Sequence, residues 1–141
     1  MFISLLQYPK ALSQYSFPKS EKLTSVKLFD KLFESGNAIN KFPFKLLWIK
    51  IIPEKKTPVK VAFAVSSRKI KSAVKRNRMK RLMRESYRLN KQQLIDVCNK
   101  KPTGIAMVFL YNGNELIPYS ETREKIILLL HRLISLHELA E

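Results

Sequence analysis

Cysteine and histidine are scarce in this chain. The 141 residues contain one cysteine, Cys98, and two histidines. A single cysteine cannot form an internal disulfide, and the sequence has no Cys/His cluster with the spacing of a metal site. These absences exclude a disulfide-stapled secreted domain and a zinc module, and they favour a reducing, cytoplasmic compartment.

Long hydrophobic runs are also missing. The segment Met1–Leu6 is apolar but short, with no basic region before it and no small-residue cleavage site, so it is a poor signal peptide. The most apolar run, Ile126–Leu130, is interrupted by His131 and Arg132, well short of the roughly 20 residues that span a bilayer. We therefore expect no membrane association.

Acidic residues are few relative to basic ones. The chain has 11 Asp and Glu against 27 Lys and Arg, which gives a formal net charge of +16. Hydrophobic residues make up 45% of the chain, so it can fold, but a folded chain of this charge repels itself unless a polyanion binds it. This composition predicts a nucleic-acid partner for one domain over residues 17–141, preceded by a mobile arm over residues 1–16.

Hydrophobic periodicity predicts an α+β fold, a small sheet packed with helices in the order α-β-β-α-β-α. Ser25 and Gly36 bracket a first helix whose apolar stripe is Leu28, Phe29, Leu32 and Phe33. A short extra strand is expected either in the arm or near Ile39. The segments expected as strands are 42–52, 59–65 and 105–111, the first two forming an antiparallel hairpin. The remaining helices are expected over 73–99 and 120–139.

The positive charge is concentrated in one segment. Residues 68–91 carry eleven Lys and Arg and a single acid, Glu85. At about 100° per residue, Met79, Leu82, Met83, Ser86 and Leu89 form a core-facing side. The opposite arc holds Asn77, Lys80, Arg81, Arg84, Arg88 and Lys91. Like charges four residues apart destabilise a helix, so an RNA- or DNA-binding face explains the pattern better than a solvated face does.

The same residues resemble a known family. The sequence AFAVSSRKI at residues 62–70, followed by AVKRNRMKRLMRE at residues 73–85, is similar to the signature of the protein component of bacterial ribonuclease P. Upstream, the stretch from Val26 to Gly36 resembles the first helix of that family. The likeness spans about residues 17–135. Lys71-Ser72 replaces a usual Gly-Asn, and Leu47 and Trp48 stand near a position where Tyr is common.

The resemblance implies a subunit that binds a catalytic RNA and the 5′ leader of precursor tRNA, and so assists an endoribonuclease whose Mg²⁺ ions are held mainly by the RNA. It implies a left-handed βαβ crossover. No obligate protein partner is evident from the sequence. Together with the basic track of the helix and the loop before it, the resemblance gives these expected RNA-binding residues: Arg68, Lys69, Lys75, Arg76, Asn77, Arg78, Lys80, Arg81, Arg84 and Arg88. Those implied in the leader cleft are Phe29, Phe33, Asn77, Lys80 and Arg84.

Several interpretations stay open. Phe29 and Phe33 are equally compatible with core packing of the first helix. Trp48, Phe63 and Cys98 are expected in the core, and Glu85 is expected as a salt-bridge partner. We find no catalytic constellation and no metal site in the chain. A ribosomal-type RNA-binding protein and a DNA-binding helix module are the competing functions, although the chain shows no helix-turn-helix partner.

Overall fold

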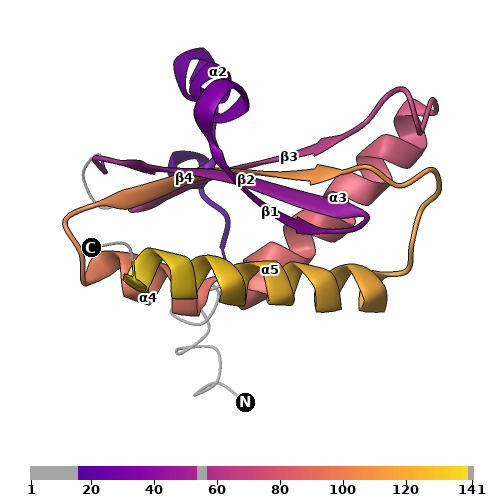
Figure 1. Cartoon of the computed structure of the whole chain (residues 1–141). Helices are drawn as coiled ribbons and strands as arrows, with labels where there is room; N and C mark the ends of the chain where they lie inside the picture. The colour runs from indigo at the N-terminus through magenta and orange to yellow at the C-terminus, as the bar shows by residue number, and fades with distance from the viewer. Residues whose placement is uncertain (1–15, 54–56, 140–141) are drawn as a thin grey trace, which may run out of the picture.

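The computed structural model describes residues 16–53 and 57–139, which fold as a four-stranded mixed sheet between helical layers. Figure 1 shows α2 on one face of the sheet and α3, α4 and α5 on the other. The predicted arm, residues 1–16, lies outside the described residues except for Ser16. The helices are η1 (Lys19–Glu21), α2 (Val26–Ser35), α3 (Ala73–Asn90), α4 (Gln92–Asn99) and α5 (Tyr119–Leu139). The strands are β1 (Asn37–Lys41), β2 (Phe44–Ile51), β3 (Val59–Val65) and β4 (Gly104–Tyr111).

The strand order β1-β2-β4-β3 confirms the α+β class but corrects the strand pairing. The predicted hairpin between β2 and β3 is wrong, because β4 lies between them, antiparallel to β2 and parallel to β3. The almost continuous apolar run of β4 explains its central position, where both its edges are paired and both its faces are covered. The hairpin forms instead between β1 and β2, which confirms the extra strand near Ile39.

Two apolar clusters lie on the two faces of the sheet. The larger cluster packs alternate residues of β2 and β4, such as Trp48 and Met107, against α3, α4 and α5. The smaller cluster joins Leu47, Ala106 and Val108 to Leu32 of α2. Because α2 is short, this second face receives only partial cover.

The first helix is confirmed with its predicted limits. Ser25 is the N-cap, and its side chain accepts a hydrogen bond from the Leu28 backbone N–H at 3.3 Å. The backbone N–H of Gly36 donates to the Leu32 carbonyl at the other end. Of the predicted apolar stripe only Leu32 is fully buried; Phe29 is half-buried and Phe33 is 58% exposed.

The single helix predicted over residues 73–99 is wrong, because it is divided at Lys91 into α3 and α4. Lys91 is 2% exposed and its Nζ lies 2.6 Å from Glu21 Oε1, while the Tyr87 hydroxyl donates to Glu21 Oε2 at 3.2 Å. Lys91 also donates to the Ser16 carbonyl. Burial, followed by the Glu21 carboxylate, raises the pKa of Tyr87 well above its usual value. The division therefore coincides with a buried polar network that ties the start of the described chain to the end of α3.

Candidate nucleic-acid interface

The loop that leads into α3 presents cations beside the start of that helix. Arg68, Lys69 and Lys71 are all exposed. Ser72 caps α3 by accepting a hydrogen bond from the Lys75 backbone N–H at 3.3 Å. The helix dipole and the free N–H groups of the first turn add to the positive potential there. This end of the helix is suited to phosphate groups.

Arg76 holds the same loop in place. Its Nη1 donates to the carbonyl oxygens of Ile70 at 2.9 Å and Lys71 at 2.8 Å. The sequence pattern assigned Arg76 to RNA contact and did not reveal this structural role. The guanidinium is half-buried, so it links the loop backbone to the cationic surface.

Replacing Arg76 with alanine is expected to lower the free energy of unfolding by about 1–2 kcal/mol, because two charge-assisted hydrogen bonds to the loop are lost. Urea unfolding followed by circular dichroism measures this change. The same variant should speed amide hydrogen exchange in residues 66–72. A stability equal to that of the parent chain would show that these bonds contribute nothing to the fold. Arg78→Ala, which removes an exposed arginine two positions away, is the matched control.

The outward side of α3 forms a shallow cationic hollow. Asn77, Arg78 and Arg81, together with Val74 and Leu82, line a space of about 550 Å³. Asn77 and Arg81 are exposed, as the helical wheel predicts, and Arg78, which the wheel places beside the apolar side, is exposed as well. Guanidinium groups one turn apart can follow a phosphate backbone, and the Asn77 amide can both donate and accept hydrogen bonds.

Arg84 belongs to a second hollow, of about 230 Å³, between α3, β3 and the segment that precedes α2. Phe17, Lys22 and Phe63 also line it. The Phe17 and Phe63 rings meet edge to face with their centroids 6.1 Å apart, and Lys22 Nζ lies 5.7 Å from the centre of the Phe17 ring. Half-buried aromatic rings beside cations are the combination that single-stranded nucleic acid requires.

Phe17 is a residue that the sequence pattern missed. Residues 1–24 have no sustained periodicity, and only tertiary contacts bring Phe17 to β3. The Leu23 N–H donates a hydrogen bond to the Val61 carbonyl at 3.0 Å, and Lys22 forms an isolated parallel β-bridge with Val61. Phe63, expected in the core, is half-buried and contributes to both the core and the hollow.

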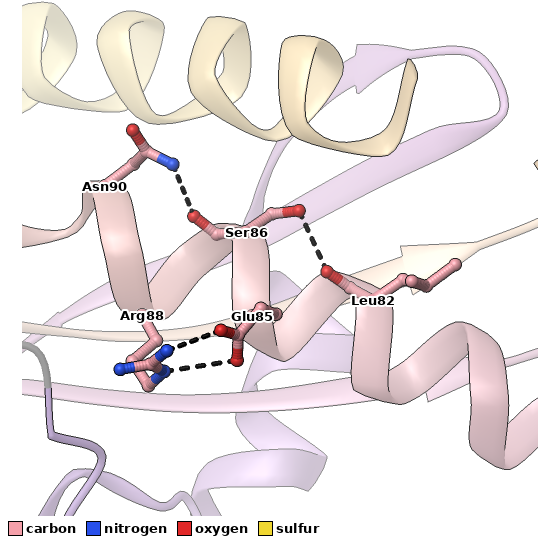
Figure 2. A network of polar contacts seen from close by, with 5 residues as sticks. All are labelled: Leu82, Glu85, Ser86, Arg88 and Asn90. Atoms are coloured by element: carbon pink, nitrogen blue, oxygen red, sulfur yellow. Dashed lines mark hydrogen bonds and ion pairs between the residues drawn. The ribbon is translucent and has the colours of Figure 1, made fainter. Parts of the chain in front are cut away.

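Arg88 is largely neutralised within the helix. Figure 2 shows its guanidinium beside Glu85; Nε donates to Oε2 at 3.2 Å and Nη2 pairs with Oε1. The hydrogen bond from Arg88 lowers the pKa of Glu85, and the Glu85 carboxylate raises the pKa of Arg88. This confirms Glu85 as a salt-bridge partner and means that the charge of Arg88 is already largely balanced within the helix.

The core-facing side of α3 is partly as predicted. Met79, Met83 and Ser86 are buried, and the Ser86 hydroxyl donates to the Leu82 carbonyl at 2.8 Å (Figure 2). Leu89 is 40% exposed, so its assignment to the core is wrong. Lys91 is buried, so its assignment to the outer arc is wrong. Both errors lie at the junction of α3 and α4, where α3 ends at Asn90 and a regular wheel no longer applies.

The residues predicted for the leader cleft are distributed over more than one surface. Arg84 lines the hollow with Phe17, Asn77 lines the hollow with Arg78, and Lys80 is half-buried. Phe29 packs against the smaller apolar cluster on the α2 face, and Phe33 is exposed on the same helix. Figure 1 places α2 on the opposite face of the sheet from the body of α3, so the sheet lies between the helix that carries these two rings and most of α3.

Cys98 is the one cysteine of the chain, and it is buried. Burial raises the pKa of the Cys98 thiol to about 11, so it is a passive core group. Residues 16–53 and 57–139 contain no group of three or more His, Cys, Asp or Glu side chains that could hold a metal ion. No helix among them is long and apolar enough to cross a membrane.

The sequence model of the family Ribonuclease P matches residues 17–133 of this chain. The chain belongs to the ribonuclease P protein family. Among its relatives, the ribonuclease P protein component of Chlorobium phaeobacteroides is 38% identical over 128 residues, which cover 84% of this chain and 88% of that protein. The corresponding component of Chlorobaculum tepidum is 31% identical over 140 residues, or 91% of each chain.

Solved ribonuclease P proteins share the fold. The protein from Thermotoga maritima superposes with a TM-score of 0.62 at 26% identity, over 79% of this chain and 96% of that one. The protein from Staphylococcus aureus gives 0.59 at 14% identity, over 82% and 99% of the two chains. The chain is thus a protein component of the ribonuclease P endoribonuclease, an RNA-binding subunit that takes part in 5′ maturation of tRNA.

Proposed function

We propose that this chain binds the catalytic RNA of ribonuclease P through the start and outer side of α3, and the single-stranded 5′ leader of precursor tRNA at the Arg84 hollow. The observation that carries the proposal is the placement of Arg84 beside the half-buried rings of Phe17 and Phe63. A cation beside flat apolar surfaces binds unpaired nucleotides with little sequence preference.

The cationic residues of the loop and of α3 divide between the two RNA ligands. The contact to the catalytic RNA uses residues at the start and on the outer side of α3, namely Arg68, Lys69, Lys75, Arg76, Arg78 and Arg81. Lys80 lies about one helical turn before Arg84 on α3, and Asn77 about two turns before it. These two residues would contact the part of the leader between Arg84 and the cleavage site. Arg88 adds least, since Glu85 already neutralises it.

Metal chemistry in this proposal resides in the RNA. Mg²⁺ would supply charge stabilisation for phosphodiester hydrolysis, and the described residues offer no carboxylate cluster to hold it. What this chain contributes is binding: it raises the affinity of the RNA enzyme for leader-bearing substrate and screens phosphate repulsion when Mg²⁺ is scarce.

The test is single-turnover cleavage of precursor tRNA by a bacterial catalytic RNA at low Mg²⁺, with and without the full chain. We expect stimulation that requires the 5′ leader. Tight RNA binding without any stimulation would overturn the proposal in favour of a ribosomal-type binding role. Equal affinity for duplex DNA and leader-bearing RNA at matched salt would point instead to a general nucleic-acid module.

A further inference from the structure

A third basic hollow, the lysine hollow, lies on the α2 side of the sheet, away from the arginines of α3. It encloses about 630 Å³ between the start of α2, the end of β2 and the start of β3. Four lysines line it, Lys27, Lys31, Lys50 and Lys60, and none of its other lining residues within 16–53 and 57–139 is acidic. Such a hollow attracts a polyanion.

The lysines are held around the hollow by three different elements. Lys27 and Lys31 are one turn apart on α2, while Lys50 and Lys60 come from β2 and β3. Lys60 Nζ also donates to the Ser20 carbonyl at 3.4 Å, which ties this surface to the segment before α2. Among the described residues no carboxylate forms an ion pair with Lys27 or Lys31. Their charges are available to a ligand.

Apolar side chains line the hollow beside the lysines. Leu28 and Ile51 are half-buried there, and Ile52 is 87% exposed. Lysine acts as a flexible point charge and lacks the bidentate geometry of arginine, so it binds phosphates without fixing their orientation. Apolar side chains between such charges suit the faces of unpaired bases better than the closed surface of a duplex.

The lysine hollow adjoins the Arg84 hollow at Thr24, which lines both of them. A single strand that leaves Arg84 can therefore cross the segment around Thr24 and reach Lys27 and Lys60 without passing through the sheet. We infer that the lysine hollow binds the sugar-phosphate backbone of leader nucleotides upstream of those at Arg84. This inference rests on the proposed function, since it extends the path of the same RNA strand.

The experiment measures binding of the reconstituted complex of full chain and catalytic RNA to precursor tRNAs whose leaders are lengthened one nucleotide at a time. With the parent chain we expect the affinity to rise in two stages as the leader grows. The first stage comes when the leader is long enough to reach Arg84, and the second when it is long enough to reach the lysine hollow. The Lys27→Ala/Lys31→Ala variant should lose about fivefold in affinity for long leaders and less than about twofold for short ones. Its salt slope with long leaders should fall by about one or two.

The matched control is Lys100→Ala/Arg123→Ala, which removes two exposed charges from the α4 and α5 side and should leave the second stage intact. Full retention of that stage in Lys27→Ala/Lys31→Ala would overturn the inference. So would an equal loss at every leader length, which would assign these lysines to the catalytic RNA. If the parent chain stimulates cleavage but its affinity for precursor tRNA rises in only one stage with leader length, this inference fails while the proposed function stands. If the parent chain gives no stimulation with any leader, the proposed function itself fails.

Discussion

Replacing Lys91 with alanine is expected to lower the free energy of unfolding by about 3–5 kcal/mol. Lys91 is 2% exposed, and its removal leaves the Glu21 carboxylate buried without the cation that lies 2.6 Å away. The Tyr87 hydroxyl alone cannot balance that charge. Urea unfolding followed by far-UV circular dichroism measures the loss, with the RNA affinity of the folded variant determined in parallel.

Two further variants test whether the uncompensated Glu21 carboxylate causes the expected loss of stability. The double variant Glu21→Gln/Lys91→Met removes both charges at once and should recover most of the stability, because the cost comes from the uncompensated carboxylate. Lys100→Ala, at an exposed position, should change the stability by less than about 0.5 kcal/mol. If Lys91→Ala instead unfolded like the parent chain and bound RNA more weakly, Lys91 would belong on the RNA-binding surface, where the helical wheel had placed it.

Lys91 also shows where prediction from sequence reaches its limit. A wheel assumes one straight helix, and residues 73–99 contain neither glycine nor proline to indicate a break. The partner that buries Lys91 is Glu21, seventy residues earlier in a segment without periodicity. Only the tertiary fold brings the two together, so no local pattern could have predicted the pair or the bend beside it.

The strand pairing has a similar explanation. Each strand was predicted from its own apolar pattern, and the short connector between β2 and β3 favoured a hairpin. The insertion of β4 between them depends on a connection through α3 and α4, whose path local periodicity does not encode. The first helix, in contrast, was predicted to the residue, because its Ser25 cap and Gly36 stop are local signals.

The binding surface was predicted as far as it follows helical spacing. Asn77 and Arg81 are exposed on α3 as expected, since that part of the helix is regular. The hollow at Arg84 was predicted only in part: Arg84 was identified, but Phe17 and Lys22 come from a segment that reaches β3 through long-range contacts. Phe29 and Phe33 are placed by α2 on the other face, where neither lines the Arg84 hollow.

Arg84→Ala is expected to weaken binding of leader-bearing precursor tRNA by about 5- to 30-fold, the equivalent of about 1–2 kcal/mol. The arginine is exposed at the rim of the hollow that contains Phe17 and Phe63, so its loss should remove a phosphate contact and leave the core intact. Affinity for mature tRNA, which has no leader, should stay within about twofold of the parent. Both affinities are measured for the complex with catalytic RNA at one salt concentration, because phosphate contacts are salt-dependent.

The comparison with mature tRNA separates a leader contact from general electrostatic attraction. Arg123→Ala removes an equal charge from α5, at a position that lines none of the hollows described above, and should affect neither ligand. Arg84→Lys keeps the charge but loses the planar fork, so it should recover part of the affinity. Equal weakening of precursor and mature tRNA by Arg84→Ala would place Arg84 against the tRNA body or the catalytic RNA. No strand of RNA would then pass over Phe17 and Phe63, and the two rings at the Arg84 hollow would contribute only to packing of the protein core.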